Sequence, residues 1–130
     1  MQKQMIPACL LTVAMAFSGP SAAEKALTGD EVKALFSGKT VDYTIVRQEF
    51  SVSAYYAEDG SMRGLSRGKK MAGSWHVNDK GELCIEYGKG DRCRQIVEED
   101  GVYRKYKEED GKQVHVVTYH TFTDGNPNNY

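Results

Sequence analysis

After Gly38 the apolar residues recur in short runs with partial alternation, which is typical of β-strands rather than helices. Turn signals such as Asp79-Lys80-Gly81 and Asp100-Gly101 separate these runs. Tight turns join antiparallel neighbours, since parallel strands need long crossover connections. The pattern therefore predicts a mainly β fold, an antiparallel meander of about seven strands in a curved sheet or a small lipocalin-like barrel. The predicted strands are 40–48, 50–57, 71–77, 82–87, 92–97, 102–107 and 112–122.

One short helix is predicted just before these strands. Thr28 and Glu31 have the spacing of a capping box, in which each side chain bonds to the other residue's backbone N–H. Leu27 and Val32 flank the cap at the spacing of a hydrophobic staple, and Gly38 suits the end of the helix. The apolar positions fall on one helical face, so we expect the helix to pack against the sheet.

The N-terminus has the features of a secretory signal peptide. Lys3 precedes the apolar run 6–17, and small residues at Ser21 and Ala23 fit the positions before a cleavage site. We therefore expect residues 1–23 to be removed and the mature chain to begin at Glu24. The predicted location is periplasmic or secreted.

Composition and charge narrow the possible partners. Removal of residues 1–23 takes away one lysine and no acid, which leaves 16 basic and 18 acidic side chains. Such a balanced, exported chain is not expected to bind nucleic acid. No later segment is apolar enough to span a membrane. The length suits a single β-rich domain over 24–123, and the polar end 124–130 is predicted to be a mobile tail.

Two cysteines remain once Cys9 leaves with the signal peptide. An even pair in an exported domain favours a disulfide between Cys84 and Cys93. If the two face each other directly, the hairpin centre falls at Gly88-Lys89, with glycine where a type II′ turn requires it. Trp75, the single tryptophan, is expected in the core.

Catalytic and metal-binding patterns are weak. The sequence has no nucleophile elbow, no H-E-x-x-H and no phosphate-binding glycine loop, so no catalytic residue and no cofactor is predicted. An enzyme whose site is assembled from distant residues stays open. His76, His115 and His120 are not expected to converge on a metal. The acidic turns around Asp59, Asp79 and 98–100 gather at one rim in a meander; this suits Ca²⁺, although exposed turns also favour such residues.

Aromatic and basic side chains are the candidates for contact with a ligand or a partner. Tyrosine and tryptophan combine an apolar face with a polar tip, but they also fill the cores of small barrels. The basic stretch 63–70 suits an anionic polymer or phosphate, although such a stretch is more often a solvated loop. The candidates are Tyr55, Tyr56, Trp75, Tyr103, Tyr106, Tyr119, Arg63, Arg67, Lys69 and Lys70.

The order of motifs resembles a known family. LTGDEVKALFSGKTV, then AYYAEDGS, then Gly73-Ser74-Trp75 with the paired cysteines is similar to the domain of unknown function 995 family of small exported bacterial proteins. That resemblance covers most of the mature chain and implies an exported single domain without a known activity. A weaker likeness, through Gly73-Ser74-Trp75 and the disulfide, is to periplasmic inhibitors of secreted metalloproteases. In those inhibitors a free N-terminal segment enters the protease, whereas this chain soon enters a capped helix.

These observations favour a non-enzymatic envelope protein that binds a small molecule or another envelope protein. An inhibitor of a secreted hydrolase is the alternative function. Strand order, barrel closure and oligomeric state stay open.

Overall fold

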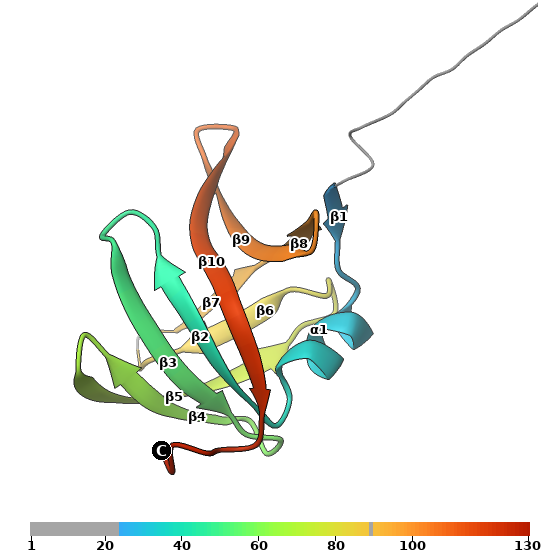
Figure 1. Ribbon diagram of the computed structural model, residues 1–130. Helices are drawn as coiled ribbons and strands as arrows, with labels where there is room; N and C mark the ends of the chain where they lie inside the picture. The colour runs from blue at the N-terminus through green and yellow to red at the C-terminus, as the bar shows by residue number, and fades with distance from the viewer. Residues whose placement is uncertain (1–23, 89) are drawn as a thin grey trace, which may run out of the picture.

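A computed structural model describes residues 24–88 and 90–130 (Figure 1). The expected signal peptide and Lys89 of the expected two-residue turn lie outside these residues. Within them, no helix has the length and apolar character that a membrane crossing requires. The elements are β1 (Glu24–Ala26), α1 (Gly29–Phe36), β2 (Lys39–Ile45), β3 (Phe50–Tyr56), β4 (Ser61–Ser66), β5 (Lys69–Val77), β6 (Leu83–Glu86), β7 (Asp91–Arg94), β8 (Ile96–Glu99), β9 (Val102–Glu109) and β10 (Lys112–Asp124).

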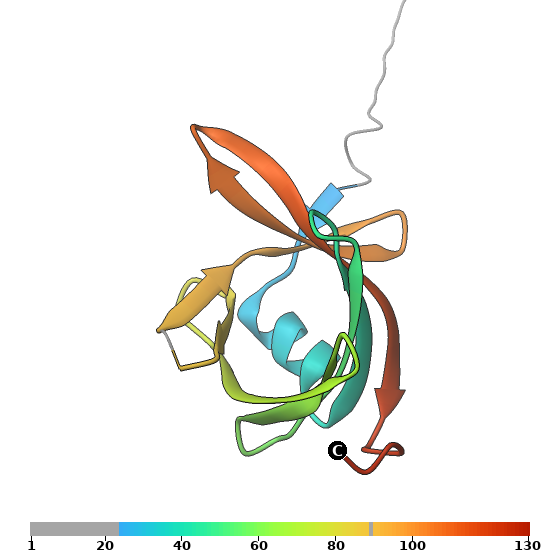
Figure 2. The ribbon, with the colours of Figure 1, turned by 90° about the vertical axis from the view of Figure 1, so that its left-hand side faces the viewer.

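The strands form one antiparallel sheet in the order β1-β8-β9-β10-β2-β3-β4-β5-β6-β7. This sheet curls into a half-barrel, so the predicted class is confirmed (Figure 2). The expected number of about seven strands is wrong, because the sheet has ten. The basic stretch adds β4, the first residues add β1, and the run 92–97 is interrupted at Gln95. That break matters, because it lets the chain leave β6 and pair with β9.

Helix α1 fills one end of the half-barrel, as the end-on view shows (Figure 2). Both halves of the predicted capping box are present: Glu31 N–H donates to Thr28 Oγ1, and Thr28 N–H donates to Glu31 Oε1. Phe36 is fully buried, and its ring packs against three aromatic side chains of the sheet. The centroid distances are 5.0 Å to Tyr56, 5.2 Å to Tyr119 and 5.3 Å to Phe122. At the opposite end of the half-barrel, no helix of the described residues covers the core.

Trp75 lies in the core, which confirms the expectation for this residue. Its side chain is buried, and its indole N–H donates a 2.8 Å hydrogen bond to the carbonyl of Ala57. The Tyr56 ring lies edge-on against it, with centroids 5.7 Å apart. The hydrogen bond matters because a buried indole N–H without a partner would destabilise the fold.

The C-terminal residues have defined contacts instead of the free end that their polar composition predicts. The Tyr130 hydroxyl donates to Ser53 Oγ at 2.9 Å, and Arg63 Nε donates to the Tyr130 carbonyl oxygen at 3.2 Å. Asn126 accepts from Tyr130 N–H at 2.9 Å. The chain end is thereby fastened to the outer face of β3 and β4.

Candidate functional site

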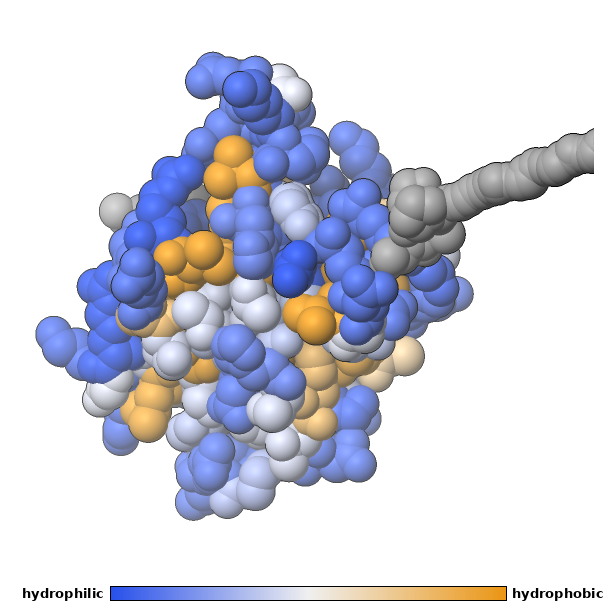
Figure 3. Space-filling view, turned by 45° about the horizontal axis from the view of Figure 1, so that its top comes forward, coloured by the Kyte–Doolittle hydropathy of each residue, from blue (hydrophilic) through white to orange (hydrophobic). Residues whose placement is uncertain are grey.

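The open end of the half-barrel, which we call the mouth, contains two adjoining hollows. Their volumes are about 470 and 450 Å³, within the range of roughly 300 to 1,000 Å³ that small-molecule sites occupy. Seen from above, apolar side chains lie between hydrophilic ones (Figure 3). The two hollows share Tyr43, Ile45, Gln48, Tyr87 and Arg92 in their walls, so they form one continuous depression.

The hollow of about 450 Å³, which we call the cationic hollow, has five basic side chains in its wall and no acidic one. They come from elements that the sequence does not place together: the turn after β2, the edge strand β7, and β9. The chain is acidic overall, so the concentration of positive charge is local. The five residues are Arg47, Arg92, Arg94, Lys105 and Lys107.

The sheet register explains why these cations point into the mouth. Arg92 pairs with Ile85 and Arg94 with Leu83, both of which are buried. Cross-strand partners share one face of a sheet, so both arginines lie on the interior face of β7. Across from β7 lies β9, which is close to it but is not hydrogen-bonded to it. We call this gap the seam; cations line both of its sides.

Lys105 is the least ordinary residue of the site. It pairs with Ile96 on β8 and Val117 on β10, two buried apolar residues, and is itself only 9% exposed. No hydrogen bond or ion pair joins its side chain to another described residue. Burial first, and then repulsion from Arg94 and Arg92, lower the pKa of Lys105 to about 8. Its Nζ is not among the fully enclosed unpaired atoms, so this partly desolvated cation opens to the hollow, and groups with such shifted pKa values concentrate at functional sites.

Some of the five basic side chains have an acidic partner among the described residues and others do not. Arg47 donates to both carboxylate oxygens of Glu109 at 3.0 and 3.2 Å, and Lys107 lies 3.4 Å from the same carboxylate. These two cations at the outer edge are therefore neutralised in part, and the pKa of Glu109 is lowered by hydrogen bonds from Arg47 and Lys107. Arg94 donates instead to the backbone carbonyl of Cys93 at 2.8 Å. No carboxylate of the described residues balances the buried Lys105 or the exposed Arg92.

The neighbouring hollow, here called the apolar hollow, has as many apolar side chains in its wall but only two cations, Arg67 and Arg92. Ile45, Phe50, Val52 and Met71 contribute apolar wall from β2, β3 and β5. Arg67, one of the sequence candidates, stands at its edge with its guanidinium 3.9 Å from the centre of the Phe50 ring. This cation–π contact holds Phe50 against the hollow. The mouth as a whole thus joins an apolar wall to a cationic one.

Tyr43 connects the mouth to the core. Its hydroxyl is buried and lies near those of Tyr56 and Tyr87, yet it makes no hydrogen bond with a described residue. The hydroxyls of Tyr56 and Tyr119 are also buried and unpaired within the described chain. Burial first, and then the neighbouring tyrosines, raise the pKa of each phenol well above its usual value. Tyr43 therefore lines both hollows with its side chain, while its neutral hydroxyl is enclosed in the core.

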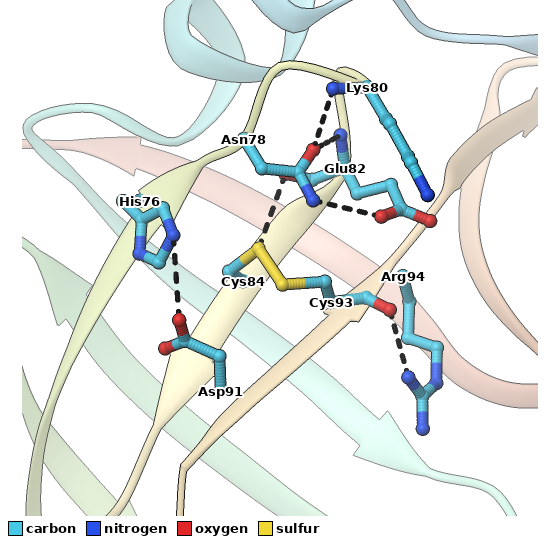
Figure 4. The surroundings of a disulfide bond; sticks show 8 residues. All are labelled: His76, Asn78, Lys80, Glu82, Cys84, Asp91, Cys93 and Arg94. Atoms are coloured by element: carbon cyan, nitrogen blue, oxygen red, sulfur yellow. Dashed lines mark hydrogen bonds and ion pairs between the residues drawn. A yellow bond between two sulfur atoms is a disulfide. The ribbon is translucent and has the colours of Figure 1, made fainter.

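The predicted disulfide holds one side of the site in place (Figure 4). Cys84 on β6 faces Cys93 on β7 in the predicted register, and the two Sγ atoms are 2.04 Å apart. Cys93 lies between Arg92 and Arg94, whose side chains point to the opposite face. The disulfide therefore holds β7, the strand that carries Arg92 and Arg94, against β6.

Several sequence candidates have core or outer-face positions instead. Tyr56, Trp75 and Tyr119 are buried in the core, and Tyr103 packs against it. Tyr106 lies on the outer face, where its hydroxyl donates to Glu99 at 2.6 Å, so the pKa of that carboxyl is lowered. These five residues are not brought together in one cavity.

The basic stretch 63–70 is a hairpin rather than a loop, formed by the end of β4 and the start of β5. Arg63 is directed to the C-terminus and pairs across the sheet with Tyr55. Lys69 and Lys70 are exposed. Only Arg67 of these cations reaches the mouth.

The histidines and the acidic turns do not form a metal site. His120 and His115 bond to the hydroxyls of Thr44 and Thr118, at 2.7 and 2.8 Å, and His76 lies 3.7 Å from Asp91. Over the described ranges, no three His, Cys, Asp or Glu side chains converge in a way that could hold a metal ion.

Comparison with known proteins adds no relative. No protein-family model matches the chain, and neither a curated protein nor a solved structure shows significant similarity to it. The resemblance to the domain of unknown function 995 family stays a prediction from the motifs. The function is therefore inferred from the geometry of the mouth.

Proposed function

We propose that this protein is an exported, non-enzymatic binding protein that holds a small anionic ligand in the mouth of the half-barrel. The observation that carries the proposal is Lys105, a buried lysine without a partner among the described residues, facing Arg92 and Arg94. An anion placed between them would form charge-assisted hydrogen bonds with all three cations. Arginine side chains suit carboxylates and phosphates in particular, because their planar fork can bind two oxygens.

A structural role does not account for Lys105. Inward-pointing charges on an edge strand discourage unwanted strand pairing, and that explanation suffices for Arg92 and Arg94 on β7. Strand β9 is not an edge, because it is paired on both sides with β8 and β10. At such a position an apolar side chain would pack between Ile96 and Val117 without the desolvation cost of a charge.

A small ligand fits the surface better than a protein partner does. The large apolar side chains that are exposed in the described residues, Leu65, Tyr87 and Val102, lie on three different elements and form no common patch. The inhibitor function needs a free N-terminal segment, whereas residues 24–26 are paired with β8 as strand β1. The concave, cationic mouth is the feature with a specific chemistry.

Binding of inorganic phosphate tests the proposal. At constant ionic strength, phosphate should shift amide resonances of β7 and β9 in a saturable manner. Arg94→Gln should raise the dissociation constant about tenfold, since a charged hydrogen bond contributes roughly 1.5 to 3 kcal/mol. Arg63→Gln is the matched control, because Arg63 lies on the outer face, and it should leave the constant unchanged. Equal effects of both substitutions, or no saturable shift, would refute an anion site in the mouth.

Export is part of the proposal and has its own measurement. The disulfide is compatible with an oxidising compartment. Intact-mass analysis of protein from the native host should give a chain that begins at Glu24, two hydrogens lighter than the reduced chain. An uncleaved N-terminus with two free thiols would contradict export.

A further inference from the structure

The mouth combines two chemistries in one depression, and this arrangement identifies the class of ligand. The cationic hollow and the apolar hollow meet at Tyr43, Tyr87 and Arg92, which belong to the walls of both. A ligand bound to the cations therefore lies beside an apolar surface. A bare anion would leave that surface in water, while a ligand with an apolar part would cover it.

The apolar hollow is suited to a hydrocarbon group. Phe50 and Met71 are half-buried, pack against the core and face the hollow from β3 and β5. The charged side chains in its wall stand at its borders: Arg67 lies on the Phe50 ring, and Arg92 is shared with the cationic hollow. Burial of apolar surface contributes in proportion to area, so a chain laid here would add affinity to that of the head group.

We propose that the ligand is a single-chain anionic amphiphile, with its carboxylate or phosphate head in the cationic hollow and its hydrocarbon chain in the apolar hollow. This inference rests on the proposed anion site and deepens it. The head lies between Arg92, Arg94 and Lys105, and the chain passes Tyr87 toward Phe50 and Met71. Tyr43 lines both hollows and forms part of the wall where the head and the chain of the ligand meet.

A series of n-alkyl carboxylates tests the inference separately from the anion site. Acetate, hexanoate, octanoate and dodecanoate are titrated by calorimetry below their critical micelle concentrations, beside inorganic phosphate and dodecyl phosphate. Affinity should rise about fourfold for each added methylene group that the hollow buries completely. Dodecyl phosphate should likewise bind far more tightly than phosphate. The charge-reversed dodecyltrimethylammonium ion should not compete.

Two variants of the protein test where the hydrocarbon chain of the ligand lies. Met71→Gln places a polar group in the apolar hollow and should reduce the gain per methylene group. Leu65→Gln is its control, since Leu65 is exposed on the outer face of the neighbouring strand β4, and it should leave the series unchanged.

The outcomes separate the two proposals. If phosphate and acetate bind but affinity does not rise with chain length, the amphiphile is refuted and the anion site stands. If neutral dodecanol binds as well as dodecanoate, or if dodecanoate binds only above its micelle concentration, the amphiphile is also refuted. If neither phosphate nor any carboxylate binds, the proposed function itself fails.

Discussion

Lys105→Met should make the protein more stable and at the same time greatly weaken its binding of anions. Methionine has a similar length and fits between Ile96 and Val117 without a charge to desolvate. The pKa of Lys105 lies at about 8 instead of its usual 10.5, so the charged form is disfavoured in the folded state. The corresponding gain in unfolding free energy at pH 7 is about 1 to 3 kcal/mol. The dissociation constant for sulfate should rise more than about tenfold.

The pH dependence of the stability difference follows from the same shift. Below pH 8, Lys105 is charged in both states, and the wild-type protein bears the full cost of burying the charge. Between pH 8 and 10.5 the folded state loses this proton more readily than the unfolded state, so wild-type stability rises toward that of Lys105→Met. The other titratable groups are the same in both proteins, so their contribution cancels in the difference. Urea unfolding of both proteins at pH 7 and pH 9.5 measures the change.

Sulfate keeps its charge over this pH range, so a change in its affinity reflects a change in the protein alone. Its affinity for the wild-type protein should fall as the pH rises through 8, because Lys105 becomes neutral while Arg92 and Arg94 stay charged. Lys107→Met is the matched control, two residues along β9, since Lys107 is half-exposed and lies near Glu109. It should change stability little. A Lys105→Met protein that is less stable than the wild type would mean that this lysine is structural.

Local features of the fold were accessible from sequence because their causes are local. Thr28 and Glu31 are three residues apart, and the capping box follows from that spacing. The register of the hairpin containing Cys84 and Cys93 follows in the same way, because a disulfide requires the two strands to be adjacent. Antiparallel pairing follows from short turns.

The site could not be predicted from the sequence, because it is formed by residues that are far apart in the chain. In the sequence, Lys105 stands in VYRKYK, where alternation alone gives Tyr103, Lys105 and Lys107 one face without showing that this face is the interior. Lys105 pairs with Ile96 and Val117, and this pairing directs its side chain to the interior. The pairing in turn depends on the break at Gln95 and on a bulge in β10 near Val116. A basic residue at every second position of both 92–94 and 105–107 was the available signal. The stretch 63–70 has more cations close together in the sequence, but only Arg67 of them reaches the mouth.

Removal of the disulfide should have the second large effect. Cys84→Ala with Cys93→Ala is expected to lower the free energy of unfolding by about 2 to 3 kcal/mol, the usual value for a short closed loop. The loss should fall mainly on β7, a four-residue edge strand that is hydrogen-bonded to β6 alone. Amides of β7 should therefore exchange with deuterium faster than those of β3.

The same substitution should weaken anion binding, although neither cysteine faces the mouth. Arg92 and Arg94 flank Cys93 on β7, so a frayed β7 loses the fixed position of both guanidinium groups, and the dissociation constant for sulfate should rise about three- to tenfold. The effect of Arg94→Gln should be smaller in the cysteine-free protein than in the wild type, because the two changes act on one strand and are not additive. Full additivity would mean that the disulfide acts on affinity independently of Arg94, and sulfate affinity unchanged in a destabilised protein would place the anion on β9 alone.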